Sequence, residues 1–230
     1  MMRQRWFGLA LAFCAVAAPA AGQDTRPGIA VLPFDNSGSY GRDKEDFEAL
    51  ERGIAGMLIS ELALNPAARV VDRSETQRLL DEQNLGRDGR VDANTAAKIG
   101  KLVGARYMVM GDFIDFYGDF RVDARLVDVE TSEIVKVVSR RQKRDELFRI
   151  IQAVADQLMK DTQLPPLPTQ IGQAAKARQV PTEALTYYSR ALLYQDRGDN
   201  AKATEYYRRA IEVFPDYTEA KEGLQKVQPA

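Results

Sequence analysis

Residues 111–129 alternate apolar and charged side chains in two runs that a tight turn separates. In an extended chain, successive side chains point to opposite sides. The apolar side of the second run comprises Phe120, Val122, Ala124 and Leu126, and the largely charged side comprises Arg121, Asp123, Arg125 and Val127. Tyr117-Gly118-Asp119 has the composition of a turn. The stretch predicts a β-hairpin with one buried face, so the chain must build a sheet.

The flanking segments predict helices that pack on this sheet. Apolar and alternating runs predict strands at 29–34, 69–72, 107–116, 120–129 and 133–140. Helical spacing predicts helices at about 44–64, from Ser74 onward, at 94–103 and at 145–160. Ser74 with Gln77 has the pattern of a capping box. The order is that of an α/β domain with a mixed sheet and packed helices.

Five aspartates in the hairpin raise the question of a metal site or an acid/base pair. They are Asp112, Asp115, Asp119, Asp123 and Asp128. These residues fall on both sides of one strand and in two turns, whereas a cation site needs oxygen ligands that converge on one point. We therefore expect them to be structural, with a cation site and carboxylate catalysis as the alternatives.

Composition excludes several kinds of chemistry. The chain has no histidine, and its one cysteine, Cys14, lies in the apolar N-terminal run. Ser-His-Asp and Cys-His catalysis and the usual zinc sites are therefore excluded. The sequence also lacks a GxxxxGK[ST] phosphate loop. We expect no cofactor and no enzymatic activity; a carboxylate-only enzyme is the remaining catalytic alternative.

The N-terminus predicts export. Residues 1–22 combine Arg3 and Arg5 with an apolar run and then small residues, the pattern of a secretory signal peptide cleaved before Gln23. A retained anchor and lipidation of Cys14 are the alternatives. Cleavage removes two arginines and no acid, so the net charge falls from −1 to −3. We expect a periplasmic chain without a membrane-spanning segment and without affinity for nucleic acid.

Several ordered segments resemble one known family. They are IAVLPF at 29–34, VDRS at 71–74, LLDEQ at 79–83, AKIGKLVGA at 97–105, VMG at 109–111 and RLVDVETSEI at 125–134. The chain over 23–162 resembles the CsgG-like family, the curli-production assembly and transport components with a fold similar to the N-terminal domain of TolB. The resemblance implies a periplasmic α/β domain that can form a ring of identical subunits.

One feature of that family is missing from this sequence. In its channel members, long hairpins cross the outer membrane. Here the two connections between predicted strands hold only three residues after Phe116 and four after Val129, whereas each crossing strand needs about 9–11 residues. We expect no pore, and a subunit of an outer-membrane secretion channel, as in curli-type export, is the alternative function.

A proline-rich linker, 163–169, precedes a helical module at 170–230. Its small and aromatic residues have the spacing of a tetratricopeptide repeat. They are Tyr187, Ala191, Tyr194, Gly198, Ala203, Tyr207, Ala210 and Pro215. The resemblance implies an all-α helical hairpin for protein–protein interaction, with Tyr207 in its core.

Two surfaces are candidate contacts with partners. The inner face of the repeat's first helix presents Leu185, Tyr188, Leu192, Gln195 and Asp196. The alternative is that this stripe packs on residues 170–178 as core. The second surface is the basic run Arg140, Arg141, Lys143 and Arg144, which is either solvated or in contact with a partner's acidic groups or anionic head groups. Together these features predict a non-enzymatic periplasmic assembly or scaffold protein that binds other envelope proteins or peptide segments, sits peripherally at the outer membrane or free in the periplasm, and is able to form a homo-oligomer.

Overall fold

The computed structural model describes residues 24–39, 43–82 and 91–228, so the predicted signal peptide lies outside it. Within these residues one mixed sheet has the order β3-β1-β4-β5-β6, and β2 pairs with β4. Its strands are β1 (Gly28–Val31), β2 (Asp35–Asn36), β3 (Arg69–Val70), β4 (Tyr107–Phe116), β5 (Asp119–Asp128) and β6 (Ile134–Lys143). β1 is parallel to β3 and β4, whereas β4, β5 and β6 are antiparallel. The predicted α/β class with a mixed sheet is confirmed.

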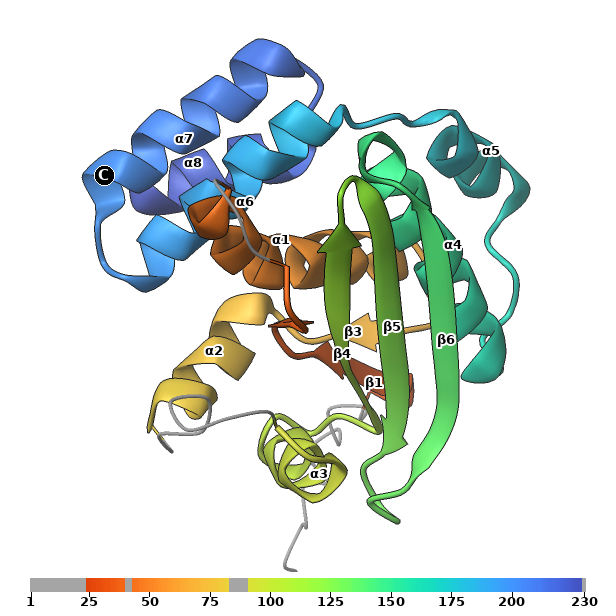
Figure 1. Cartoon of the computed structure of the whole chain (residues 1–230). Helices are drawn as coiled ribbons and strands as arrows, with labels where there is room; N and C mark the ends of the chain where they lie inside the picture. Colours follow the sequence, from red (N-terminus) through yellow and green to blue (C-terminus); the bar gives the residue numbers. More distant parts are fainter. Residues whose placement is uncertain (1–23, 40–42, 83–90, 229–230) are drawn as a thin grey trace, which may run out of the picture.

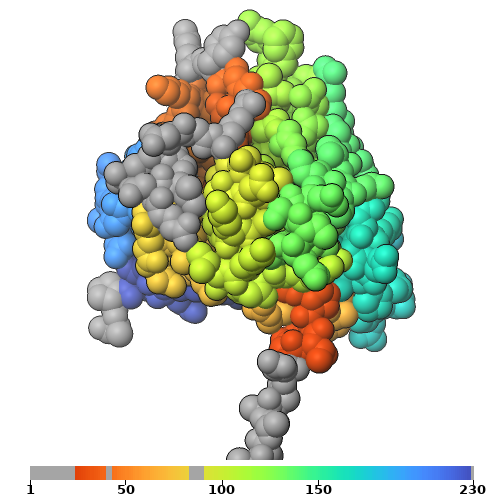
Figure 2. Space-filling view, turned by 90° about the horizontal axis from the view of Figure 1, so that it is seen from below, coloured from red at the N-terminus to blue at the C-terminus, as the bar shows by residue number. Residues whose placement is uncertain are grey.

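Helices cover both faces of this sheet (Figure 1). They are α1 (Lys44–Ala63), α2 (Arg73–Glu82), α3 (Ala93–Leu102), the short 3₁₀ turn η1 (Arg144–Glu146), α4 (Leu147–Asp161), α5 (Thr169–Ala177), α6 (Thr182–Asp196), α7 (Asn200–Val213) and α8 (Thr218–Val227). Helices α1 and α4 share one apolar core with the sheet, and α2 and α3 share a second core on the other face. Seen from below, the surface runs from α7 and α8 (blue) past α2 and α3 (yellow) to the strands (green) and to α4 and α5 (teal) (Figure 2).

Alternation of side chains explains how one strand serves both cores. Ile29 and Val31 of β1 enter the core with α1 and α4, while Ala30 and Leu32 enter the core with α3. A strand that is covered on both faces needs a continuous apolar run. In β5 the predicted apolar side, from Phe120 to Leu126, is buried, and the charged side, except Val127, is at least partly exposed.

The β4–β5 turn is one residue shorter than the sequence suggested. Asp119 pairs with Phe116 in the ladder, so only Tyr117 and Gly118 connect the strands. Both have positive φ, at 53° and 84°, as a two-residue turn of type I′ requires. Strand β6, in contrast, is longer than predicted: it continues to Lys143 and so includes most of the basic run.

The start of α2 differs from the expected capping box. The helix begins at Arg73, and the Asp72 carboxylate accepts hydrogen bonds from the Ser74 backbone N–H at 2.8 Å and from the Ser74 hydroxyl. Ser74 is thus a donor to the cap rather than the cap itself. The Asp72 carboxylate caps the helix because an ionised acceptor binds a free backbone N–H at a helix start more strongly than a hydroxyl does.

The linker leads to a helical module that shares the first core. Helices α6 and α7 form the predicted hairpin, and α8 packs against α7 and α6. Tyr207 and Tyr217 are fully buried between them, which confirms Tyr207 as a core ring. One apolar cluster runs from the sheet through α1 into α6, α7 and α8. The division of the chain at 163–169 stays a prediction, because the described modules share this cluster.

Candidate functional site

The predicted partner-binding stripe of α6 faces the chain's own helix α1. Leu185, Tyr188 and Leu192 are only 0%, 6% and 5% exposed. Two glycines of α1 lie beneath them: a Cβ on Gly56 would lie 2.9 Å from the Tyr188 hydroxyl and 3.1 Å from a Leu192 methyl, and a Cβ on Gly53 would overlap Ser189. These glycines let the two helices approach closely.

The stripe is not open to a partner in this structure, so the alternative that it is packed core agrees with the burial of its apolar residues. The helix that covers it is α1, however, and not residues 170–178. The reason is physical. One helical hairpin cannot bury its own apolar face, and α1 offers a complementary face without side chains at two positions. Figure 1 shows α1 between the sheet and helices α6–α8.

Ion pairs surround this helix contact. Asp196, a predicted site residue, pairs with Arg73 of α2 at 2.8 Å and with Arg52 of α1 at 3.0 Å, and the side chains of Arg73 and Asp196 are each only 10% exposed. Gln195 accepts a hydrogen bond from the buried Tyr207 hydroxyl at 2.6 Å. The polar end of the predicted stripe therefore joins α6 to α1, α2 and α7.

A small polar cleft remains beside the contact. It has a volume of about 250 Å³, and Tyr188, Leu192 and Gln195 line it together with residues of α2 and α8. Lys226 and Asp72 form an ion pair of 3.2 Å among its lining residues. Burial raises the pKa of the Tyr188 hydroxyl well above its usual value. The cleft is too small for the 300–1,000 Å³ typical of ligand pockets.

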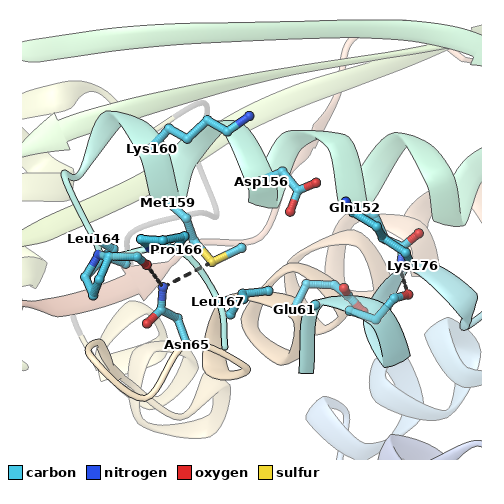
Figure 3. A pocket seen from close by; sticks show the side chains of 13 residues that line it. Glu61, Asn65, Gln152, Asp156, Met159, Lys160, Leu164, Pro166, Leu167 and Lys176 are labelled. Carbon is cyan, nitrogen blue, oxygen red and sulfur yellow. Dashed lines mark hydrogen bonds between the residues drawn. The ribbon is translucent and has the colours of Figure 1, made fainter. Parts of the chain in front are cut away.

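A larger groove lies beneath the proline linker (Figure 3). Its volume is about 410 Å³, and α1, α4, the linker and α5 contribute its walls. Asn65 donates a hydrogen bond to the Pro165 carbonyl at 2.9 Å, and Gln152 donates one to the Ala175 carbonyl at 2.8 Å. These two amides hold the linker and α5 against the end of α1 and against α4.

The groove contains one buried carboxylate. The Glu61 side chain is 5% exposed, and Arg178 lies 3.4 Å from it. Burial raises the pKa of Glu61 to about 7, although Arg178 opposes the shift. Arg178 also pairs with Glu219 of α8. This cluster therefore links α1 to α8 across the segment that follows α5.

The hairpin aspartates each pair with an arginine. The pairs are Asp112 with Arg125, Asp115 with Arg144, Asp119 with Arg141, Asp123 with Arg121, and Asp128 with Arg106. No three His, Cys, Asp or Glu side chains among the described residues are grouped so that they could hold a metal ion. The five aspartates therefore act as ion-pair partners on the sheet.

The residues of the basic run do not point the same way: Arg140, Arg141 and Lys143 belong to β6, and Arg144 begins η1. Arg144 pairs with Asp115 and Asp43 and lies 5.0 Å from the centre of the Phe47 ring. Arg141 pairs with Asp119 at 2.6 Å, and Arg140 donates to the Ser139 carbonyl at 2.8 Å. Because successive side chains of β6 alternate, these residues do not form one patch, and a role in partner binding stays a prediction.

Sequence reasoning missed the residues that join the modules. Gly53 and Gly56 fall on one face of α1, three residues apart, and a pair of small residues on one helix face permits the close approach of another helix. That spacing was the available signal. Among the described helices, none is long and apolar enough to span a membrane.

Comparisons with known proteins agree with the two resemblances. The model for "Curli production assembly/transport component CsgG" matches residues 10–121, and the tetratricopeptide repeat model matches residues 184–217. The chain therefore carries a CsgG-like domain followed by a tetratricopeptide repeat. No curated protein matches the sequence.

Solved structures with a similar arrangement are distant. The C-terminal domain of LpoB from Salmonella enterica is 20% identical, with a TM-score of 0.38, over 54% of this chain and 87% of that chain. TolB from Acinetobacter baumannii is 17% identical, with a TM-score of 0.42, over 60% of this chain and 29% of its own. The PelC dodecamer from Paraburkholderia phytofirmans is 14% identical, with a TM-score of 0.37, over 64% of this chain and 94% of that chain. Similarity at this level carries no functional argument.

Proposed function

We propose that this chain is a non-enzymatic assembly scaffold of the bacterial cell envelope, exported by its predicted signal peptide and active in the periplasm. The domain pair supports this proposal, because a CsgG-like domain is joined to a repeat whose general use is protein–protein interaction. The side-chain chemistry also supports it, since the hairpin carboxylates are occupied by arginines.

The observation that carries the proposal is the shared helix α1. Its one side packs on the sheet, and its other side packs on α6 through Leu185, Tyr188 and Leu192. The repeat is therefore a fixed part of the molecule and not a mobile arm. A body of this kind presents the exposed surfaces of both modules at a constant distance and angle, which is what an assembly scaffold requires.

Affinity capture tests the proposal. The mature chain, immobilised through its C-terminus, is exposed to envelope extracts, and retained proteins are quantified by mass spectrometry. The comparison variant carries Gly53→Ala, whose added Cβ would overlap Ser189 and so weaken the contact of α6 with α1 without removing a core side chain. We expect a defined set of envelope proteins on the native chain and a reduced set on the variant.

Two outcomes contradict the proposal. The first is retention of no envelope protein above an empty matrix. The second is ion conductance when the native chain is added to liposomes, which favours the channel alternative.

A further inference from the structure

Strand β6 ends the sheet with an open edge. Among the described strands it pairs with β5 alone. It is ten residues long, and only Val138 is buried. Long, exposed edge strands present unpaired backbone groups that can hydrogen-bond another chain.

The register fixes which backbone groups face outward. The Arg144 N–H donates to the Gly118 carbonyl at 2.9 Å, and this pair continues the β5–β6 register. Hydrogen-bonded pairs alternate in an antiparallel ladder, so Val138, Arg140 and Gln142 bond to β5. The N–H and C=O groups of Val137, Ser139, Arg141 and Lys143 therefore point away from the sheet. The hydrogen bond from the Arg140 side chain to the Ser139 carbonyl agrees with this direction.

The side chains of this edge combine apolar surface with positive charge. Ile134, Val135 and Val137 are 46%, 49% and 56% exposed, although β-branched residues are usually covered in a sheet. The strand also carries Lys136, Arg140, Arg141 and Lys143 and no acidic residue.

The positive charge of β6 determines which kind of chain can pair with its open edge. A second copy of β6 would place lysines and arginines opposite one another, and like charges on paired strands are destabilising. An extended segment that alternates acidic and apolar residues would instead place its acids beside Lys136 and Arg140 on one face of the strand and its apolar residues beside Val137 on the other face. Resting on the scaffold role proposed above, we propose that the outer edge of β6 binds an extended acidic segment of a partner protein, which adds to the sheet as a further strand.

A peptide binding assay tests this inference with the full mature chain. The probe is a fluorescein-labelled ten-residue peptide that alternates Glu and Val, and the readout is fluorescence anisotropy. The control peptides are one in which Lys replaces Glu and an acidic one that is interrupted by prolines. We expect binding of the Glu-Val peptide only, and weaker binding as salt rises from about 50 mM to about 500 mM because screening increases.

The matched protein variants are Ser139→Pro and Ser139→Ala. Proline is tolerated at an edge position whose N–H faces solvent, yet it cannot donate to an added strand. Ser139→Pro should weaken binding by about 10-fold or more, since it removes a main-chain hydrogen bond and disturbs its neighbours. Ser139→Ala keeps the N–H and should change binding by less than about 2-fold.

Hydrogen exchange on the native chain decides the matter if Ser139→Pro does not fold. With the Glu-Val peptide bound, the amides of Val137, Ser139, Arg141 and Lys143 should gain protection. Those of Val138, Arg140 and Gln142 are bonded to β5 already and should change little. Equal protection in both sets would overturn the inference.

Three further results would overturn it. They are unchanged binding by a folded Ser139→Pro variant, equal binding of the proline-interrupted peptide, and self-association of the native chain that Ser139→Pro abolishes. If the peptide fails to bind while envelope proteins are still captured, this inference fails and the scaffold role stands. If neither occurs, both fail.

Discussion

Substituting Gly53 with alanine should weaken the contact between α1 and α6. An added Cβ would lie 1.7 Å from the Ser189 Oγ, 2.6 Å from its Cβ and 3.3 Å from its Cα. Rotation of the hydroxyl cannot relieve the second overlap, so the helices must separate. Ser189 is fully buried, and its hydroxyl donates to the Leu185 carbonyl at 2.7 Å.

The expected magnitude follows from two opposing effects. Alanine in place of glycine inside a helix stabilises by about 0.5–1 kcal/mol. Overpacking a core costs about 1–3 kcal/mol. Separation of the helices also exposes part of Leu185, Tyr188 and Leu192. We therefore expect Gly53→Ala to lower the free energy of unfolding by about 1–2 kcal/mol.

Urea denaturation followed by far-ultraviolet circular dichroism measures this change. The matched control is Gly172→Ala in α5, where an added Cβ would lie 3.7 Å from the Leu167 Cβ, an ordinary contact. The control should gain about 0.5–1 kcal/mol. Adding Ser189→Gly to Gly53→Ala should recover part of the loss, with a coupling free energy of about 0.5–3 kcal/mol. If Gly53→Ala stabilises the chain as much as Gly172→Ala does, the close approach of the helices is refuted.

Three other substitutions probe separate parts of the structure. Tyr188→Ala should lower stability by about 3–5 kcal/mol, because it removes a buried ring that packs on Tyr207 and Tyr217; an unchanged melting temperature would return Tyr188 to the role of a partner anchor. The pKa of Glu61 is raised from 4.5 to about 7, so the unfolded chain loses this proton first, and stability should fall by up to about 3 kcal/mol as pH rises from 4.5 to about 7. Glu61→Gln should flatten that fall in urea titrations across this range, and an identical pH dependence in both chains would contradict the assignment. Tyr117 is 90% exposed at φ 53°, so Tyr117→Asn should raise stability by about 0.5–1 kcal/mol; a lower melting temperature would show that its edge contact with Phe116 matters more.

Local pattern predicted most of the helices and strands, although not the two-residue strand β2, because their causes lie within a few residues. Alternation from Phe120 to Val127 was sufficient to assign both faces of β5, since the period of a strand is fixed by its backbone. The same holds for α1, whose predicted limits differ from the observed ones by one residue at the C-terminal end. The Ser74 cap failed because two acceptors compete there, and the pattern does not rank them.

Long-range contacts could not be predicted in the same way. The partners Arg73 and Asp196 are 123 residues apart, and each is an ordinary charged residue in its own segment. The apolar stripe of α6 is evident in its sequence, but nothing local to it identifies α1 as the helix that covers it. The three-residue spacing of Gly53 and Gly56 indicates that another helix can approach α1 closely. It does not identify that helix, which the structure shows to be α6.

Native-state hydrogen exchange tests most directly whether the repeat and the CsgG-like domain form one body. The chain without the predicted signal peptide, residues 23–230, is exchanged at increasing urea below its unfolding transition. Opening free energies are compared between the α1 amides from Ile54 to Leu58 and the α6 amides from Leu185 to Leu192. Because one core cluster joins them, both sets should open only in global unfolding, with equal free energies. If the α6 amides open at a free energy lower by about 2 kcal/mol or more while those of α1 stay protected, the repeat is an independent arm.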